Sequence, residues 1–456
     1  MFIEAIKDAG LAHMSYVIGD GRTAAVIDPR RDFSVYLEAA ARHGVNITHI
    51  FDTHRNEDFV HGSPGLAARS GAQIHHGAAL DFGYGKAVHE GDSFEFGDVR
   101  LSILETPGHT EESISIVASH TAVSDEPIAV FTGDALFVGD VGRTDFYPDR
   151  AREVAGKLYD SLFDKLLPLG DQVVLYPAHT AGSVCGGDMV DREFSTLGYE
   201  REHNPRLQLS RDEFVQAKLD ENHYQPPYFR QMEKLNKAGP DSLPSPPEPR
   251  LYTPNEFAAA GEDGLIFVDV REPEAFCGVH VPGAVLLPVN MLPSFAGWLL
   301  PYDRDIGLIA DGRDQYDQAA HHLIRLGYDR ISGYLHGGMT AWESAGMACD
   351  SVPGVTVMEL RQRLDRDEDL TVLDVRSIDE FNSGHVPGAV HHYVGQVPEK
   401  VGELPSDRPV ITFCGSGRRA AIAAASLKRA GFKRVENCFG SMKAWRKQGY
   451  ETADPG

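Results

Sequence analysis

The chain has 456 residues, 42% of them hydrophobic and 24% charged, which is the composition of a soluble folded protein and argues against disorder. Its 43 basic and 67 acidic side chains give a net charge of −24, which disfavours nucleic acid and anionic membranes as partners. The amino terminus shows no secretory signal, no apolar stretch approaches the ~20 residues of a spanning helix, and the five cysteines are scattered. We therefore expect a cytoplasmic protein without membrane spans or disulfides, built from two to four domains of ~100–200 residues.

The first predicted elements are a helix and the strand that follows it. Asp32 is placed to cap a helix whose apolar residues 33–41 share one face, and Gly44 is placed to end it. The apolar residues 47–51 predict a strand that carries His54 to its end, where α/β proteins usually place their chemistry.

Four polar signatures follow apolar runs in the first part of the chain: Thr53-His54-Arg55-Asn56-Glu57-Asp58-Phe59, Thr106-Pro107-Gly108-His109-Thr110, Phe131-Thr132-Gly133-Asp134 and Tyr176-Pro177-Ala178-His179. Their order and spacing resemble the metallo-β-lactamase superfamily, most closely its persulfide dioxygenase and glyoxalase II branch. The resemblance implies an αββα sandwich in a metal domain that spans residues 1–237.

The same resemblance implies that His54, His109 and Asp134 are the three ligands of a mononuclear Fe(II) site. Two histidines and one carboxylate leave positions open on the iron for a thiolate-type substrate and for dioxygen. Zinc is the alternative metal.

The first signature departs from the family pattern His-x-His-x-Asp-His, because Asn56 and Phe59 replace its second and third histidines. A second metal position would keep only Asp58 and His179, and Phe59 has no lone pair to offer. The departure therefore favours an iron oxygenase over a dinuclear zinc hydrolase.

Two further residues are predicted to bind substrate. Arg143, in the segment Gly142-Arg143-Thr144-Asp145-Phe146, matches a dioxygenase-like segment, and a structural role for this loop is an equal alternative. Cys185 lies six residues after His179, where it could accept sulfur or be a buried inert thiol. His61, His75 and His76 receive no assignment.

A domain boundary is predicted at residues 237–249, which contain five prolines. Beyond it, the segment Phe267-Val268-Asp269-Val270-Arg271 returns as Leu373-Asp374-Val375-Arg376, at an offset of 105 residues from Asp269 to Asp374. Two homologous domains, 250–350 and 355–456, are therefore expected, each with strands and helices alternating around a mostly parallel sheet.

The last domain contains the run Val410-Ile411-Thr412-Phe413-Cys414-Gly415-Ser416-Gly417-Arg418-Arg419, a strand that leads into a glycine-rich loop and a helix. The repeats and this loop resemble rhodaneses. A cysteine at a helix amino terminus, near Arg418 and Arg419, is favoured as a thiolate and can carry a persulfide. We assign these three residues to catalysis, whereas Ala310 takes the place of the cysteine in the middle domain.

Phosphatase chemistry at Cys414 and a catalytic role for the other three cysteines of this region are less favoured. A tyrosine-phosphatase loop would need an arginine six positions after the cysteine, where Ala420 stands. Cys277, Cys349 and Cys438 are interpreted as structural.

Together, the two resemblances imply an α/β sulfur-metabolising enzyme that oxidises a low-molecular-weight thiol persulfide with dioxygen to sulfite and transfers sulfane sulfur to or from thiosulfate. A zinc-dependent thioester hydrolase of glyoxalase II type and a non-enzymatic sulfur carrier or sensor are the alternatives. The oligomeric state is left open, a homo-oligomer included.

Overall fold

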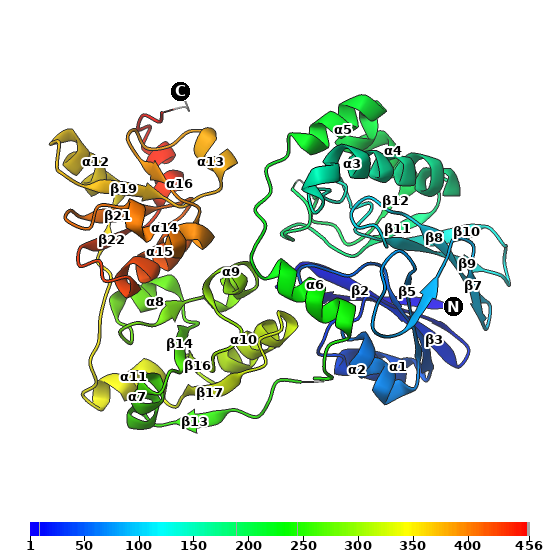
Figure 1. The fold of residues 1–456 in the computed structure, drawn as a ribbon, viewed down its shortest axis with the longest axis horizontal. Helices are drawn as coiled ribbons and strands as arrows, with labels where there is room; N and C mark the ends of the chain where they lie inside the picture. The colour runs from blue at the N-terminus through cyan, green and yellow to red at the C-terminus, as the bar shows by residue number, and fades with distance from the viewer. Residues whose placement is uncertain (9, 188, 244, 454–456) are drawn as a thin grey trace. The chain divides into compact units, whose positions relative to one another are not determined.

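The computed structural model describes residues 1–8, 10–187, 189–243 and 245–453 (Figure 1). The chain divides into two compact units, one of Met1–Pro246 with Ile324–Gly327 and one of Pro247–Leu323 with Tyr328–Gly456. Pro244, in the predicted linker, lies outside the described residues. Within the described ranges, no helix combines the length and the apolar character that crossing a bilayer requires.

The first unit contains two six-stranded sheets. One has the order β1-β2-β3-β4-β5-β6, with the bounds β1 (Phe2–Asp8), β2 (His13–Asp20), β3 (Thr23–Ile27), β4 (Asn46–Asp52), β5 (Gln73–Gly77) and β6 (Lys86–Val88). The other has the order β12-β11-β10-β9-β8-β7, with the bounds β7 (Ser93–Phe96), β8 (Val99–Glu105), β9 (Ile114–His120), β10 (Pro127–Gly133), β11 (Val174–Pro177) and β12 (Ser195–Thr196). The helices are α1 (Ser34–His43), α2 (Ser63–Ser70), α3 (Ala151–Asp160), α4 (Leu197–His203), α5 (Arg211–Leu219) and α6 (Phe229–Ala238).

The two sheets pack face to face, with helices on their outer faces. Successive strand residues point to opposite faces, so Tyr16 of β2 lies in the core between the sheets and Val17 packs with the helices outside. Leu66 of α2 belongs to that outer core, and Leu158 of α3 belongs to the matching core on the second sheet. Figure 1 shows α1 and α2 on one side of the strands and α3, α4 and α5 on the other. The predicted αββα sandwich is confirmed.

The helix α1 ends as predicted but does not begin as predicted. Gly44 has φ 67°, and its N–H donates to the carbonyls of Ala40 and Ala41, which ends the helix. The predicted cap at Asp32 is wrong, because Phe33 occupies the N-cap position and no side chain caps the helix. The Asp32 carboxylate instead forms an ion pair with Arg30 Nε at 3.1 Å.

The second unit contains two five-stranded sheets with one topology. The orders β13-β17-β16-β14-β15 and β18-β22-β21-β19-β20 are identical when each sheet is counted from its own first strand, and every strand pair within them is parallel. Their bounds are β13 (Arg250–Tyr252), β14 (Ile266–Asp269), β15 (Val285–Leu286), β16 (Ile306–Ile309), β17 (Ile331–Leu335), β18 (Gly354–Val355), β19 (Thr371–Asp374), β20 (Val390–His391), β21 (Val410–Phe413) and β22 (Val435–Cys438). The helices are α7 (Pro254–Glu262), α8 (Pro273–Gly278), α9 (Leu292–Leu299), α10 (Arg313–Arg325), α11 (Gly338–Ser344), α12 (Val357–Asp365), α13 (Ile378–Asn382), α14 (Val397–Lys400), α15 (Arg418–Arg429) and α16 (Ser441–Lys447).

A buried ion pair explains why the Asp-Val-Arg sequence occurs in both repeats. Asp269 and Asp374 end the equivalent strands β14 and β19, and each accepts from the guanidinium two residues later, Arg271 or Arg376, at 2.7 Å. Each arginine also donates to a backbone carbonyl eight residues further on. Because all four side chains are buried, losing one partner would leave the other charge uncompensated.

Candidate metal centre and sulfur-transfer loop

Three buried side chains from three loops of the first unit converge on one point. His54 Nε2 lies 3.6 Å from Asp134 Oδ2, and His109 Nε2 lies 3.5 Å from the same oxygen. None of the three atoms has a hydrogen-bond partner among the residues that the structure describes. Buried polar atoms are seldom left without partners, and two imidazoles and a carboxylate are suitable ligands for a metal ion. The structure thus brings the three predicted ligands together in an arrangement that fits a metal.

Hydrogen bonds to the other ring nitrogens orient the two histidines. Thr53 Oγ1 donates to Asp28 Oδ2 at 2.8 Å, so it accepts a hydrogen bond from the Nδ1–H of His54 at 2.9 Å. His109 Nδ1 donates to the backbone carbonyl of Arg143 at 2.9 Å. With the proton on Nδ1, each Nε2 keeps its lone pair directed at the cluster.

Asp134 is oriented in the same way by His179. The Nδ1 of His179 donates to Asp134 Oδ1 at 2.7 Å, which leaves Oδ2 facing the two histidines. On its other side, His179 Nε2 lies 2.9 Å from Asp58 Oδ2. Burial alone would lower the pKa of His179, but Asp134 and Asp58 raise it well above the usual value. His179 is therefore held between the carboxylates of Asp134 and Asp58.

Asp58 and His179 also form a second buried group with Cys185. Burial raises the pKa of the Cys185 thiol well above its usual value, and the nearby carboxylates of Asp58 and Asp134 raise it further. Without a bound cation, Cys185 is thus a neutral thiol next to the proposed ligands. Its predicted role as a sulfur acceptor stays a prediction.

Two residues of this region were missed by the sequence analysis. His13 on β2 is buried beside Phe59, with ring centroids 4.1 Å apart, and neither of its ring nitrogens has a partner within the described ranges. It stands 41 residues before His54, outside every signature. Glu57 is also buried, and its Oε2 lies 3.6 Å from His109 Nε2. The sequence feature that could have identified Glu57 is its position inside the first signature.

Arg143 is held by groups of the protein itself. Its guanidinium forms two hydrogen bonds of 2.6 Å with Asp145, donates to the carbonyl of Val184 at 3.0 Å, and lies over the rings of Phe146 and Phe229. Its backbone carbonyl is the group that orients His109. The predicted contact with substrate is untested, whereas these contacts give Arg143 a structural function in the loop.

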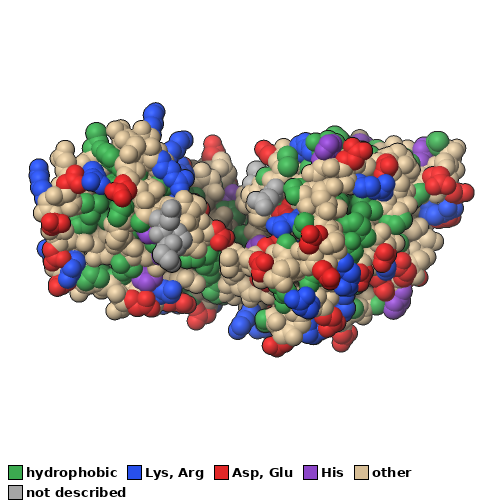
Figure 2. All heavy atoms as spheres, turned by 90° about the horizontal axis from the view of Figure 1, so that it is seen from above, with side chains coloured by type: hydrophobic (Ala, Val, Ile, Leu, Met, Phe, Trp, Pro, Cys, Tyr) green, Lys and Arg blue, Asp and Glu red, His purple; other side chains and the backbone are tan. Residues whose placement is uncertain are grey.

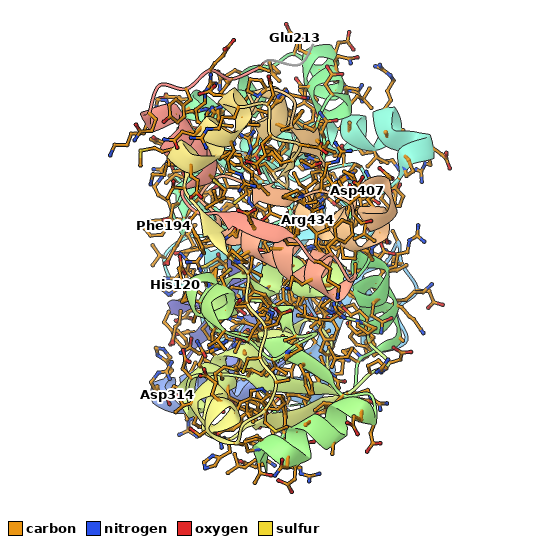
Figure 3. The ribbon with its side chains drawn as sticks, turned by 90° about the vertical axis from the view of Figure 1, so that its left-hand side faces the viewer. His120, Phe194, Glu213, Asp314, Asp407 and Arg434 are labelled. Atoms are coloured by element: carbon orange, nitrogen blue, oxygen red, sulfur yellow. The ribbon has the colours of Figure 1, made fainter. Side chains whose placement is uncertain are left out.

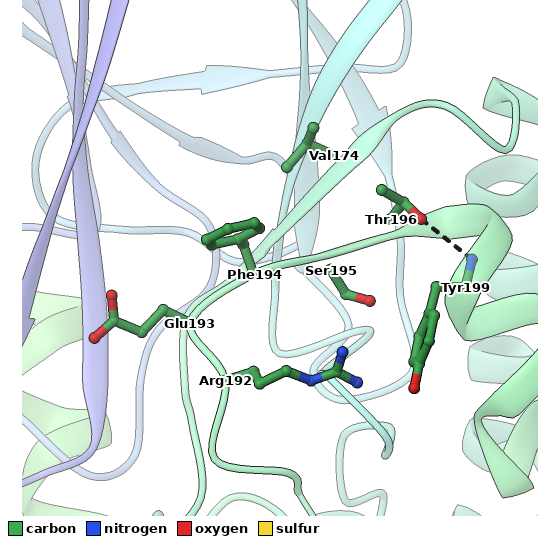
Figure 4. Close-up of a pocket in the computed structure, with 7 residues that line it drawn as sticks. All are labelled: Val174, Arg192, Glu193, Phe194, Ser195, Thr196 and Tyr199. Atoms are coloured by element: carbon green, nitrogen blue, oxygen red, sulfur yellow. Dashed lines mark hydrogen bonds between the residues drawn. The ribbon is translucent and has the colours of Figure 1, made fainter.

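Described residues of the first unit line cavities of different character. A cavity of about 560 Å³ is lined by Phe146, Pro148, Gln225, Pro226, Pro227, Phe229, Arg230 and Glu233. The Phe146 ring also stands edge-on to the His109 ring, with centroids 5.2 Å apart, so one lining residue of this cavity contacts a predicted ligand. The other, of about 460 Å³, lies around Phe194 and Tyr199 (Figure 4) and contains none of the predicted site residues. Phe194 is exposed at the edge of the molecule (Figure 3).

In the second unit, Cys414 lies buried between the end of β21 and the start of α15. Its Sγ accepts from the N–H of Gly417 at 3.1 Å, and its own N–H donates to Ser441 Oγ at 3.1 Å. Arg419 makes two hydrogen bonds with Glu380, at 2.6 and 2.7 Å, and Arg418 donates to Glu272 at 2.9 Å. Both predicted catalytic arginines therefore have carboxylate partners, and the contact to the sulfur comes from a backbone N–H.

The remaining cysteine positions differ from Cys414. Ala310 is buried at the equivalent position after β16, so the middle domain has no nucleophile there. Burial raises the pKa of Cys277 and of Cys438 to about 12, which keeps both as thiols at neutral pH. Cys349 is exposed.

The fold and these sites can be compared with known proteins. The description "Metallo-beta-lactamase superfamily" matches residues 9–179, and "Rhodanese-like domain" matches residues 253–345 and 356–448. The chain is 31% identical over 241 residues to the protein named persulfide dioxygenase ETHE1, mitochondrial, of Bos taurus, which covers 50% of this chain and 79% of that protein. It is 38% identical over 103 residues to the putative sulfur carrier protein YrkF of Bacillus subtilis, covering 23% of this chain and 56% of that protein.

Among solved structures, a metallo-beta-lactamase from Staphylococcus aureus subsp. aureus COL aligns with a TM-score of 0.65 and 31% identity. The alignment covers 74% of this chain and 98% of that chain, so the likeness extends well beyond the first unit. The chain therefore belongs to the metallo-beta-lactamase superfamily, among the homologues of persulfide dioxygenase ETHE1, and carries two rhodanese-like domains in tandem.

Proposed function

We propose that this protein oxidises the persulfide of a low-molecular-weight thiol at a mononuclear Fe(II) site and passes sulfane sulfur through Cys414. The observation that carries the proposal is that one buried ligand atom each of His54, His109 and Asp134 lie close together, without hydrogen-bond partners among the described residues. Relatives named persulfide dioxygenase and rhodanese-like domains support a function in sulfur metabolism.

The oxidation balances without a further reductant. One persulfide, one dioxygen and one water give one thiol and one sulfurous acid, which ionises to sulfite. A 2-His-1-carboxylate iron supplies open positions for both the thiolate-type substrate and dioxygen. The chain orients the ligands through Thr53, the Arg143 carbonyl and His179, and the cavity beside Phe146 offers space for the rest of the thiol.

The transfer step uses the loop around Cys414. Sulfite attacks the terminal sulfur of a Cys414 persulfide anion, the sulfur–sulfur bond to Cys414 breaks, and thiosulfate leaves as Cys414 returns to a thiolate. The Gly417 N–H stabilises that thiolate, since it already donates to Sγ. The reverse direction loads Cys414 from thiosulfate. Ala310 excludes the same chemistry from the middle domain.

Replacing one ligand tests the metal assignment. We expect His109→Ala to lose bound iron and persulfide-dependent oxygen uptake together, while circular dichroism still reports a folded chain, because a ligand is removed but little core volume. His120→Ala, at the end of β9 and outside the cluster, is the control and should keep both. Wild-type oxygen uptake by His109→Ala would refute the assignment.

A second candidate function is hydrolysis of a thioester by a dinuclear centre. The group of Asp58, His179 and Cys185 favours it, because it offers a second set of ligands beside the first. Hydroxyacylglutathione hydrolase of Rhizobium johnstonii is 36% identical over 163 residues, which cover 57% of that protein. Two metal ions per chain and thioester cleavage without oxygen would support this candidate, and one iron with oxygen consumption would exclude it.

A further inference from the structure

The Thr53 hydroxyl differs from the carbonyl that orients the other histidine ligand, because a hydroxyl can act in two ways. His109 Nδ1 donates to the backbone carbonyl of Arg143, which can only accept, so this partner alone fixes the position of the ring proton. A threonine hydroxyl can donate a hydrogen bond or accept one. Its contact with His54 Nδ1, at 2.9 Å, therefore determines the tautomer of His54 only together with the other partner of the hydroxyl.

The carboxylate of Asp28 is that other partner. Its Oδ2 accepts from Thr53 Oγ1 at 2.8 Å, and its Oδ1 accepts from the backbone N–H of Thr53 at 2.7 Å. An ionised carboxylate has no proton to donate, so the single hydroxyl proton of Thr53 points to Asp28 and an oxygen lone pair faces His54. His54 then carries its proton on Nδ1, which leaves the lone pair of Nε2 free, 3.6 Å from Asp134 Oδ2.

Two adjacent parallel strands bring these residues together. Ile27 is paired with Phe51 near the ends of β3 and β4, and the N–H of Asp28 donates to the Phe51 carbonyl at 2.8 Å. Asp28 has φ 50°, a left-handed conformation that aspartate adopts more readily than most residues. Asp28 is 2% exposed and Thr53 and His54 are each 1% exposed, so bulk water does not replace the hydrogen bonds between them.

We propose that Asp28 is a positioning residue of the metal site, which through the Thr53 hydroxyl keeps the His54 proton on Nδ1 and the Nε2 lone pair available to the ion. The inference rests on the proposed function for the assignment of His54 as a ligand, but not on the identity of the metal or on the oxidation. Histidine ligands are commonly oriented by an acceptor on their second nitrogen. Here that acceptor is a hydroxyl, and the carboxylate behind it decides that the hydroxyl accepts.

The substitution Asp28→Asn reverses the direction of these hydrogen bonds with little change of shape. The backbone N–H of Thr53 can only donate, so the amide oxygen takes the place of Oδ1 and the amide NH₂ faces the Thr53 hydroxyl. The NH₂ then donates to that hydroxyl, whose own proton turns to His54 Nδ1. The ring proton moves to Nε2, where it blocks the lone pair that would bind a metal ion.

Two measurements on the full chain test this at about pH 8, where a histidine ring of ordinary pKa is neutral. Burial raises the pKa of Asp28 to about 7, so most of its carboxylate is ionised there as well. NMR of isotope-labelled histidine in the metal-free protein, with His54→Ala to identify the signal, reports which ring nitrogen of His54 carries the proton. Anaerobic titration with Co(II) reports the affinity. We expect Asp28→Asn to move the proton to Nε2 and to weaken Co(II) binding at least ~10-fold.

Two controls separate this role from a general loss of stability. Asp52→Asn also removes a buried carboxylate, at the end of β4, but that carboxylate accepts from Ser63 and Tyr84. It should therefore keep the His54 proton on Nδ1. In Thr53→Val the hydroxyl is gone, so adding Asp28→Asn to this variant should change neither the tautomer nor the Co(II) affinity further.

Each outcome bears on the inference. A proton on Nε2 of His54 in the wild-type metal-free chain overturns it, and that measurement needs no variant to fold. A folded Asp28→Asn chain that keeps the proton on Nδ1 overturns it too, and so does a further loss of Co(II) affinity when Asp28→Asn is added to Thr53→Val. If His54 behaves as expected but the iron-loaded wild-type protein consumes no oxygen with a persulfide, the proposed function fails and the role of Asp28 stands.

Discussion

Single hydrogen bonds set the chemistry of each site, because they decide which atom of a side chain remains free. The Thr53 hydroxyl and the Arg143 carbonyl accept hydrogen bonds from the Nδ1–H groups of His54 and His109, so both Nε2 atoms face Asp134. In the last domain, the Gly417 N–H meets Cys414 Sγ. The candidate metal site thus presents lone pairs that suit a cation. The loop around Cys414 instead presents an N–H donor, which suits an anionic sulfur.

This contrast predicts that the two activities separate. In Cys414→Ser, oxygen uptake should persist while rhodanese activity is lost and sulfite accumulates in place of thiosulfate, since a hydroxyl ionises far less readily than a thiol. Sulfite and thiosulfate are measured by derivatisation and chromatography. Ala310→Ser is the matched control in the middle domain and should change neither product.

Spontaneous reaction of sulfite with persulfide must be subtracted in that assay. Enzymatic thiosulfate formation at the wild-type rate by Cys414→Ser would then rule out sulfur transfer through this cysteine.

How far residues could be predicted depends on whether their partners are near in sequence. The prediction that Gly44 ends α1 depended only on residues of that helix, and it was correct. Asp32 fitted the same local pattern, but an ion pair with Arg30 engages its carboxylate, and it was wrong as a cap. His13 and Glu57 were missed because their neighbours in space come from other strands and loops.

At the scale of elements, the end of β10 shows how the backbone limits the site. Gly133 has φ 54°, and a Cβ there would lie 2.6 Å from Thr53 Oγ1, the hydroxyl that orients His54. Only glycine combines that conformation with that contact. The Thr-Gly-Asp signature was found in the sequence, but the close approach of Thr53 required the packed sheets.

Gly133→Ala should therefore destabilise the first unit and weaken metal binding. The left-handed backbone alone costs ~1–2 kcal/mol for a residue with a Cβ, and the contact with Thr53 adds to that cost. Gly21→Ala is the control, because Gly21 has φ 58° but no atom lies within 4 Å of its added Cβ.

Urea unfolding and metal titration distinguish the two variants. Gly21→Ala should lose only the backbone contribution and bind metal as the wild type does, whereas Gly133→Ala should lose more stability and at least ~10-fold in metal affinity. Equal losses of stability and of metal affinity in both variants would contradict the role assigned to the Thr53 contact.

The repeated Asp-Val-Arg sequence allowed the two domains of the second unit to be predicted as homologous, and their identical strand order agrees. What the repeat could not predict was the pairing of Arg418 with Glu272 and of Arg419 with Glu380. These carboxylates lie far from the loop in sequence, so their effect on the arginines appears only in the folded chain.

At the scale of the whole molecule, the chemistry is divided between two compact units with their own cores. The proposed metal ligands all belong to the first unit, and Cys414 belongs to the second. Despite the net charge of −24, basic side chains are interspersed among acidic ones on the face shown in Figure 2. The proposed ligands sulfite and thiosulfate are anions, so the proposal requires local donors for them, such as the N–H of Gly417 beside Cys414.

This division predicts that metal removal destabilises one unit only. A bound ion stabilises the unit that holds it by ~2.7 kcal/mol at a free concentration 100 times the Kd, which corresponds to a Tm shift of about 5–10 °C for a domain of this size. All three tryptophans, Trp298, Trp342 and Trp445, lie in the second unit, so their fluorescence follows that unit alone. Anaerobic addition of a chelator should lower the Tm of one calorimetric transition. The Tm of the transition monitored by tryptophan fluorescence should stay unchanged. His109→Ala should show the lower transition with or without the chelator. A tryptophan transition that moves with the metal by the same amount would mean that the chain unfolds as one cooperative block, contrary to the independence inferred from the separate cores.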